Sequence, residues 1–153
     1  RDIIYWKGLN ISGTPQTAAT LGLTYYSPWY ANFGINANYF GRNYVSMAPA
    51  LRTDRARAAL DQGYIHPERL RDGFTVDLFA SYSWRIKYGT FLRFNLSVSN
   101  VLNNKQLPSG GFEQLRVRTQ RDESGQQIPF RPFDPKLSYV YGTTFFLNTT
   151  LQF

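Results

Sequence analysis

The stretch that decides the fold is residues 137–153, LSYVYGTTFFLNTTLQF. Every second residue counted back from Phe153 is mostly apolar or aromatic, whereas the intervening residues are mostly small and polar. Successive side chains of a β-strand point to opposite faces, so this pattern predicts one long strand with an apolar face. Strands of soluble sheets run to about 5–6 residues. A lipid-facing strand of an outer-membrane barrel needs ~9–11 tilted residues, apolar outside and polar inside, and this is the kind of strand we expect here.

Two further segments, 74–86 and 90–102, alternate in the same way. Residues 87–89 between them are expected to form a three-residue hairpin loop, because Gly89 can adopt the left-handed conformation that such a loop needs. Pairing Ile86 with Thr90 brings both apolar sets to one face. The opposed pairs that this register predicts are Trp84–Leu92, Tyr82–Phe94, Ala80–Leu96 and Leu78–Val98.

The first forty residues repeat the pattern less regularly. Residues 18–26 and 29–39 alternate on either side of a tight Ser-Pro turn, and pairing Tyr26 with Tyr30 again brings the apolar sets together. Residues 3–11 form a weaker candidate strand, which makes about six antiparallel strands in all. We expect Leu78, Leu96, Phe33, Ile35 and Leu147 to face lipid, and Asp77, Asn95, Asn36 and Asn148 to face a lumen.

The connections alternate between very short and very long. Residues 41–73 and 103–136 are long loops rich in Gly, Pro, Arg and Asp. Loops beyond about 12–15 residues are uncommon in compact soluble domains, whereas outer-membrane barrels combine short inner turns with long outer loops. Within the first loop we expect a helix over Asp54–Leu60 after a Thr53 cap, and one helical turn at Pro67–Arg71.

Composition narrows the possible functions. The 153 residues include 17% aromatic side chains and no cysteine, which excludes a disulfide framework and thiolate chemistry. The formal charge of +7 is spread over loops of mixed sign, which argues against nucleic-acid binding. His66 is the single histidine and has no cluster of acidic or imidazole groups near it in sequence. We therefore expect no metal site, no cofactor and no enzymatic activity.

Six strands are too few to close a membrane barrel. Single-chain bacterial barrels begin at about eight strands, and bare strand edges are not tolerated in lipid. The fold class expected is thus all-β, an antiparallel transmembrane β-barrel segment. Residues 1–153 would be the C-terminal part of a larger barrel, or one chain of a barrel assembled from several.

Three stretches carry a resemblance to a known family. Residues 95–104, NLSVSNVLNN, run from a polar-alternating strand into an Asn-rich break. This resembles the penultimate strand of TonB-dependent outer-membrane receptors, with NVLN at 100–103 in place of an NLF(N/D)-like motif. Residues 14–40 and 142–153 are similar to the Bacteroidota (SusC-like) branch of these receptors, in its PQ loop, its GL-Y-SP and NYF segments, and its closing strand with a terminal Phe.

The resemblance implies a barrel of about 22 strands that is plugged by an N-terminal domain outside these residues. It implies TonB-dependent active transport of a nutrient, such as a glycan, peptide or chelate, across the outer membrane of a Gram-negative bacterium. The implied partners are the rest of the barrel and its plug, the TonB system through segments absent here, the barrel-insertion machinery, and in some members a SusD-like surface lipoprotein. Outer-membrane lipid and lipopolysaccharide would surround the strands.

Three sets of residues are the functional candidates. The loops supply candidate contacts to a ligand or partner at Arg52, Arg55, Arg57, Tyr64, Arg116, Arg118, Arg121 and Arg131. Aromatic girdles are expected at Tyr25, Trp29, Tyr39, Phe74 and Trp84. A C-terminal assembly signal is expected at Phe145, Leu147, Leu151 and Phe153.

Two alternatives stay open on the sequence. One is an independent small outer-membrane barrel, an adhesin or a lipid-modifying enzyme, closed by oligomerisation. The other is a soluble β-sandwich that acts as a binding module. The mass of the native polypeptide separates the receptor from the small barrel, and dependence on lipid or detergent separates both from the soluble module.

Overall fold

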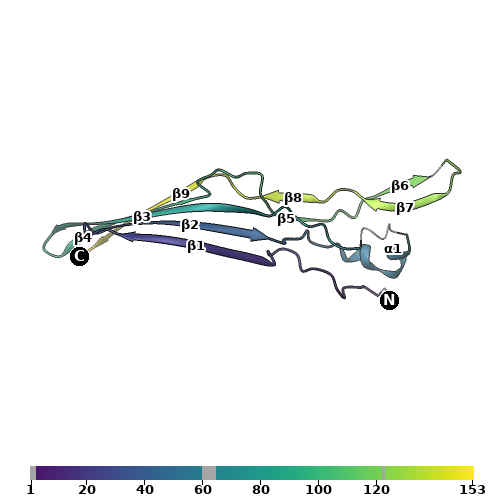
Figure 1. Ribbon diagram of the computed structural model, residues 1–153, viewed down its shortest axis with the longest axis horizontal. Coiled ribbons are helices and arrows are strands. Elements are labelled where there is room, and N and C mark those ends of the chain that lie inside the picture. Colours follow the sequence, from purple (N-terminus) through teal and green to yellow (C-terminus); the bar gives the residue numbers. More distant parts are fainter. Residues whose placement is uncertain (1–2, 60–64, 122) are drawn as a thin grey trace. The chain divides into compact units, whose positions relative to one another are not determined.

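Five antiparallel strands form the main sheet of the computed structural model, in the order β1-β2-β3-β4-β9 (Figure 1). The structure describes residues 3–59, 65–121 and 123–153. The five strands are β1 (Thr17–Tyr26), β2 (Ala31–Gly41), β3 (Gly73–Lys87), β4 (Thr90–Ser99) and β9 (Thr144–Gln152). Among the described residues β1 and β9 each have one neighbour in the sheet, so the sheet is open. The expected all-β fold is confirmed in part: the structure is mostly β, with antiparallel sheets and one short α-helix among the described residues.

The chain divides into two compact units. The sheet unit comprises Thr17–Phe40, Asp72–Leu107 and Val140–Phe153. The loop unit comprises the described parts of Arg1–Gln16, Gly41–Arg71 and Pro108–Tyr139. Its elements are η1 (Pro49–Arg52), α1 (Asp54–Ala59), β5 (Pro108–Phe112), β6 (Val117–Arg121), β7 (Gln127–Pro132) and β8 (Lys136–Tyr139).

The predicted β3–β4 hairpin is confirmed in its register. Trp84–Leu92, Tyr82–Phe94, Ala80–Leu96 and Leu78–Val98 are all opposed pairs. The turn itself differs from the prediction, because Lys87 pairs with Thr90 and only Tyr88 and Gly89 lie between the strands. Both turn residues have positive φ, 49° and 86°, as a two-residue hairpin turn requires. A register shift between Arg85 and Lys87 absorbs the difference.

The β1–β2 register is shifted by two positions from the predicted one. The backbone N–H of Ser27 donates to the carbonyl of Ala31 at 2.8 Å, whereas opposing Tyr26 to Tyr30 would have placed Ser27 against Trp29. The physical reason is the left-handed Tyr30, with φ 61°, which ends a three-residue loop rather than starting the strand. A shift of two residues preserves which face each side chain occupies, so the predicted faces hold.

The two faces of the sheet follow the predicted alternation. One face contains the cross-strand rows Phe33–Ala80–Leu96–Leu147 and Ile35–Leu78–Val98–Phe145. The other contains Asn36 opposite Asp77, and the row Asn32–Ser81–Asn95–Asn148. The residues expected to share an apolar face therefore do so, and so do those expected to share a polar one.

The C-terminal strand is shorter than predicted. Residues 137–153 do not form one strand: β8 ends at Tyr139 and β9 begins at Thr144. The break follows from Asn100, whose side-chain amide donates to the carbonyl of Tyr141 at 2.8 Å. The hydroxyl of Thr143 donates to the carbonyl of Asn100, also at 2.8 Å. These bonds hold the connecting segment against the end of β4, and β8 pairs with β5 instead.

The long loops are folded rather than irregular. The segment 103–136, expected as a loop, contains β5, β6 and β7, with β6 paired to β7. Val45, Leu51 and Leu70 are buried in the loop unit and give it a small apolar core. No helix among the described residues has the length and apolar character needed to cross a membrane.

Three local predictions in the loop unit have different outcomes. Helix α1 begins at Asp54 as predicted, and the Thr53 hydroxyl caps it by accepting the N–H of Ala56 at 3.3 Å; Leu60 lies outside the described residues. The helical turn at Pro67–Arg71 is wrong, because backbone hydrogen bonds and a bridge tie this segment in extended form to residues 43–45. The strand over 3–11 is also wrong, since only a single bridge, Ile4 to Thr53, forms there.

Candidate functional site

The apolar face of the sheet unit is exposed over its whole length. Phe33 is 53% exposed, Trp84 54% and Leu147 60%, although each belongs to a strand that is paired with a neighbour. Other large apolar residues of this face that are exposed are Leu21, Leu23, Ile35, Phe74, Leu78, Tyr82, Leu96, Phe145 and Leu151. Exposed apolar patches larger than a few hundred Å² mark surfaces that bind a partner or a membrane.

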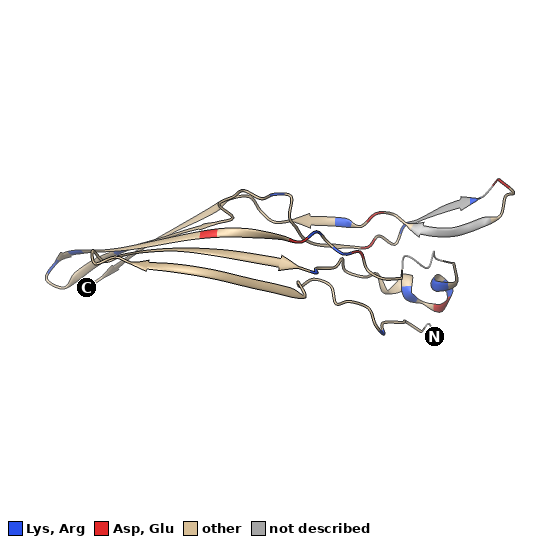
Figure 2. Ribbon diagram, viewed as in Figure 1, with Lys and Arg blue, Asp and Glu red and all other residues tan. Residues whose placement is uncertain are grey.

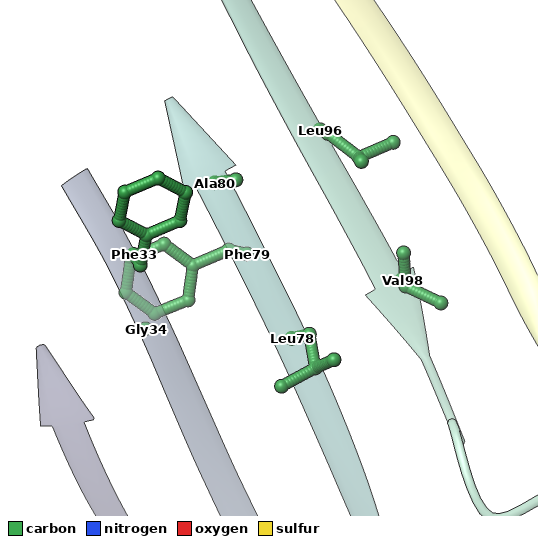
Figure 3. A pocket seen from close by; sticks show the side chains of 7 residues that line it. All are labelled: Phe33, Gly34, Leu78, Phe79, Ala80, Leu96 and Val98. Carbon is green, nitrogen blue, oxygen red and sulfur yellow. The ribbon is translucent and has the colours of Figure 1, made fainter. Parts of the chain in front are cut away.

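A shallow hollow interrupts this face where a small residue lies among large ones. Ala80 is flanked in its row by Phe33 and Leu96, and Leu78 and Val98 line the adjacent row (Figure 3). Gly34 and Phe79 complete the lining. The short side chain of Ala80 explains the hollow, which has almost no polar lining and offers no group for chemistry.

Aromatic side chains lie near both ends of the apolar face. At one end Tyr39 of β2 is directly opposite Phe74 of β3. At the other end Trp84 lies ten positions further along β3, and Trp29 precedes β2, whose Ala31 is opposite Tyr82. At ~3.3 Å per residue and a tilt of about 45°, ten positions span about 23 Å along a membrane normal. This agrees with the height of the apolar band of outer-membrane barrels, about 25 Å.

The remaining predicted girdle residues are also exposed. Tyr25 is 61% exposed near the end of β1, and Trp29 is 77% exposed in the turn that follows. The structure thus brings all five predicted girdle residues to the surface of the sheet unit, in positions near the two ends of its strands.

The polar face carries a hydrogen-bonded network centred on Asp77. Its carboxylate accepts the side-chain amide of Asn38 at 2.8 Å and the backbone N–H of Asn100 at 2.8 Å. The hydroxyl of Thr20 donates to the amide oxygen of Asn38 at 3.0 Å. Asp77 therefore joins β1, β2 and β3 to the turn after β4. This hydrogen-bonded carboxylate therefore has a structural role in the sheet unit.

Arg52 was expected to contact a ligand or partner and therefore to be exposed, but the structure buries it. It is 2% exposed, and its guanidinium forms a two-pronged ion pair with Glu113 at 2.5 and 2.6 Å. It also donates to the carbonyl of Ile65 at 3.2 Å, and Glu113 accepts the backbone N–H of Ala48 at 2.9 Å. The pair ties the first long loop to β5. A guanidinium held in this way is unavailable for a ligand in solution.

The other loop candidates fall into three groups. Arg57 lies over the ring of Tyr5, 4.5 Å from its centroid, and the hydrogen bond to Asp54 raises the pKa of Tyr5. Arg55, Arg116 and Arg121 are exposed. Tyr64 lies outside the described residues, as do the side chains of Arg118 and Arg131, whose backbones pair between β6 and β7.

The predicted assembly residues lie at the free edge of the sheet unit. Phe145, Leu147 and Leu151 are 80%, 60% and 54% exposed on β9, and Phe153 is 98% exposed. Sequence reasoning missed Phe146, which points from β9 to the polar face opposite Ser97 and is 66% exposed. The available signal was that Phe146 is an aromatic residue at a position where the alternation along 144–152 otherwise puts small or polar residues.

Sequence reasoning noted Asn100 only as the start of the NVLN stretch at 100–103, without a structural role, and it missed Glu113. Asn100 is 5% exposed and has φ 52°, a conformation that asparagine adopts more readily than most residues. Its position just after the alternating strand was a signal for a turn, although not for its many partners. Nothing local marks Glu113 as the partner of Arg52, since the two are far apart in sequence. Over the described ranges, no three His, Cys, Asp or Glu residues are grouped so as to hold a metal ion.

Comparisons of the chain with protein-family models, with curated proteins and with solved structures find no match.

Proposed function

We propose that the sheet unit spans an outer membrane as part of a larger antiparallel β-barrel, with its apolar face toward lipid. The observation that carries this proposal is the exposed apolar face between two aromatic ends that are separated by about the thickness of a bilayer's apolar band. Water would penalise such a surface at roughly 25 cal/mol per Å², whereas lipid would not. The polar face, with its Asn, Ser and Thr rows, then lines the interior.

The open edges of the sheet unit support the same proposal. Strands β1 and β9 each present unpaired backbone groups along one side, within the described part of the chain. Unpaired backbone groups in lipid cost several kcal/mol each, so further strands must pair with both edges in a membrane. In this reading the sheet unit is the C-terminal section of a barrel of about 22 strands, as the sequence resemblance implies.

The activity we propose is TonB-dependent transport of a nutrient across the outer membrane, and it rests on that resemblance. Along the chain, both long loops follow β2 and β4 at the strand ends that the β3–β4 turn does not join, so in this proposal the loops belong on the outer surface of the cell. The Arg52–Glu113 pair and the small apolar core make the loop unit a rigid platform. A ligand or a lipoprotein partner would then meet Arg55, Arg116 and Arg121 rather than Arg52.

The membrane part of the proposal is tested on the native polypeptide. We expect it in the outer-membrane fraction, extractable only with detergent, and much heavier than the 17.6 kDa of this chain. A native mass near that value would favour the small oligomeric barrel instead. Purification as a stable monomer without detergent would favour the soluble binding module and contradict the proposal.

The transport part is tested by uptake. Cells lacking the gene should lose energy-dependent uptake of one member of a panel of glycans, peptides and metal chelates. A variant with α1 replaced by a short Gly-Ser linker, and another with residues 123–126 shortened, should insert normally but take up less of that substrate or lose its lipoprotein partner. Unchanged uptake and partner binding in both variants would place recognition elsewhere.

A further inference from the structure

A register shift in the β3–β4 hairpin moves Lys87 to the apolar face of the sheet unit. Arg85 of β3 is opposite Phe91 of β4, and the next opposed pair is Lys87 with Thr90. Strand β3 therefore has one extra residue here, as in a β-bulge. Thr90 has the same parity as the apolar-face residues of β4, and directly opposed residues share a face. Lys87 thus lies on the apolar face, although strict alternation would put it beside Arg85 on the polar one.

No side-chain carboxylate of the sheet unit lies near this amine, within the residues that the structure describes. The acidic residues of the unit, Asp72 and Asp77, belong to the other end of β3 (Figure 2). Ten positions separate Asp77 from Lys87, which is about 33 Å along an extended strand. The ammonium of Lys87 lies 4.8 Å from the ring centroid of Tyr88, and this neutral ring leaves the charge uncompensated. Lys87 is exposed and attracts an anion from outside the chain.

The position of Lys87 along the strands gives its depth in the proposed membrane. Trp84, Leu92 and Leu151 form one cross-strand row of the apolar face. Thr90 lies two positions beyond Leu92, which is about 5 Å along a membrane normal at ~3.3 Å per residue and a tilt of about 45°. The polar layer on each side of a bilayer's hydrocarbon core is about 5–7 Å thick. Lys87, opposite Thr90, is therefore at the depth of the lipid headgroups.

We propose that Lys87 and Thr90 bind the phosphate of a membrane glycerophospholipid whose acyl chain lies along Trp84 and Leu92. The inference rests on the proposed function, since it takes the apolar face as the one that meets lipid. The ammonium of Lys87 supplies the opposite charge, and the hydroxyl of Thr90 is a second donor beside it. Trp84 is 54% exposed directly next to these donors. A lipid satisfies both the donors and the apolar row, whereas a free phosphate ion would leave the row in water.

Retention of lipid by the full-length protein tests this proposal. The protein is inserted into vesicles of phosphatidylglycerol and phosphatidylcholine and re-extracted with mild detergent, and the retained lipids are counted by native mass spectrometry. We expect retention of phosphatidylglycerol over phosphatidylcholine. The variant Lys87→Gln/Thr90→Val should lower the retained phosphatidylglycerol about fivefold, and Lys87→Arg should keep it. Unchanged retention in the double variant would overturn the proposal.

The polar face of the same hairpin provides the matched control. Arg85→Gln/Arg93→Gln removes two cations close to Lys87 in sequence and pairing, but from the opposite face, so it should leave retention unchanged. Loss of phosphatidylglycerol in this variant, with normal retention in Lys87→Gln/Thr90→Val, would place the phosphate on the polar face and contradict the proposal.

Inorganic phosphate separates the two sources of the anion. An excess of it, at constant ionic strength, should not displace the retained phosphatidylglycerol, because the acyl chain adds contacts that the free ion lacks. Full displacement would assign the site to free phosphate and contradict the proposal. These measurements use protein already inserted in vesicles, so they can fail while the membrane assignment stands. A chain that does not enter vesicles would contradict the proposed function itself.

Discussion

The ring of Phe79 on β3 lies over the backbone of Gly34, its opposed partner on β2, so that no room remains for a Cβ at that position (Figure 3). Gly34 is thus required by a close approach across the polar face, and the ring covers a strand that has no side chain there. The two residues act as one packing unit on a face otherwise formed mainly by Asn, Ser and Thr.

Gly34→Ala should therefore destabilise the sheet unit. We expect a loss of about 1–3 kcal/mol in the free energy of unfolding, because the ring of Phe79 must leave its position. Urea unfolding in lipid vesicles measures this. The same substitution in a Phe79→Ala background should cost much less, since the added methyl group then fills space. Equal costs in both backgrounds would show that the ring does not contact Gly34.

Neighbouring residues on β4 should respond very differently to arginine. Leu96→Arg should cost about 2–4 kcal/mol, because Leu96 belongs to the apolar face and lies near the middle of the proposed span. Ser97→Arg should cost far less, because Ser97 belongs to the polar face. The amount of folded protein in the membrane and its urea midpoint are the readouts. Similar losses at the two sites would rule out lipid contact on one face only.

The buried ion pair of the loop unit should tolerate paired substitution but not single substitution. Glu113→Gln leaves Arg52 buried without its counter-charge and should cost about 3–5 kcal/mol. Limited proteolysis within 41–71 should report this loss. Glu123→Gln, at an exposed position, is the control and should have no effect. The double variant Arg52→Met/Glu113→Leu should recover much of the stability; a loss as large as that of the single variant would show that the pair acts through more than its charges.

Substitutions of Asn100 should separate backbone conformation from hydrogen bonding. Asn100→Gly accommodates the positive φ but removes the bonds to Tyr141 and Asn104, and should cost about 1–3 kcal/mol. Asn100→Ala should cost about 1–2 kcal/mol more, because alanine disfavours that conformation. Asn95→Ala, on the exposed polar face, should be nearly neutral in the same unfolding assay.

Removal of Phe153 should affect assembly more than activity. The residue is 98% exposed beyond the free edge of β9, an edge that must pair with another strand before a barrel can close. We expect less folded receptor in the outer membrane, with nearly normal uptake for each molecule that does insert. Quantitative immunoblotting of heat-modifiable protein, normalised to uptake, measures both. An unchanged amount of inserted protein would exclude this role.

Alternation along the strands was sufficient to predict much of the sheet. The β3–β4 register follows from period two and a short turn, because a slip by one residue would move every apolar side chain to the wrong face. The same argument predicted which residues share each face, including Leu96 with Leu147 and Asn95 with Asn148. It could not choose between registers that differ by two residues, which is why the β1–β2 pairing was displaced while its faces were right.

What the sequence by itself determined is local and periodic: the antiparallel strands, their two faces, the aromatic ends and the Thr53 cap. What only the tertiary structure decided depends on contacts between distant residues. The side chain of Asn100 breaks the C-terminal strand by binding Tyr141, and Glu113 buries Arg52, a residue that its loop composition indicated as exposed. Neither pairing has a sequence period, since each is selected by the hydrogen bonds that remain to be satisfied once the strands have paired.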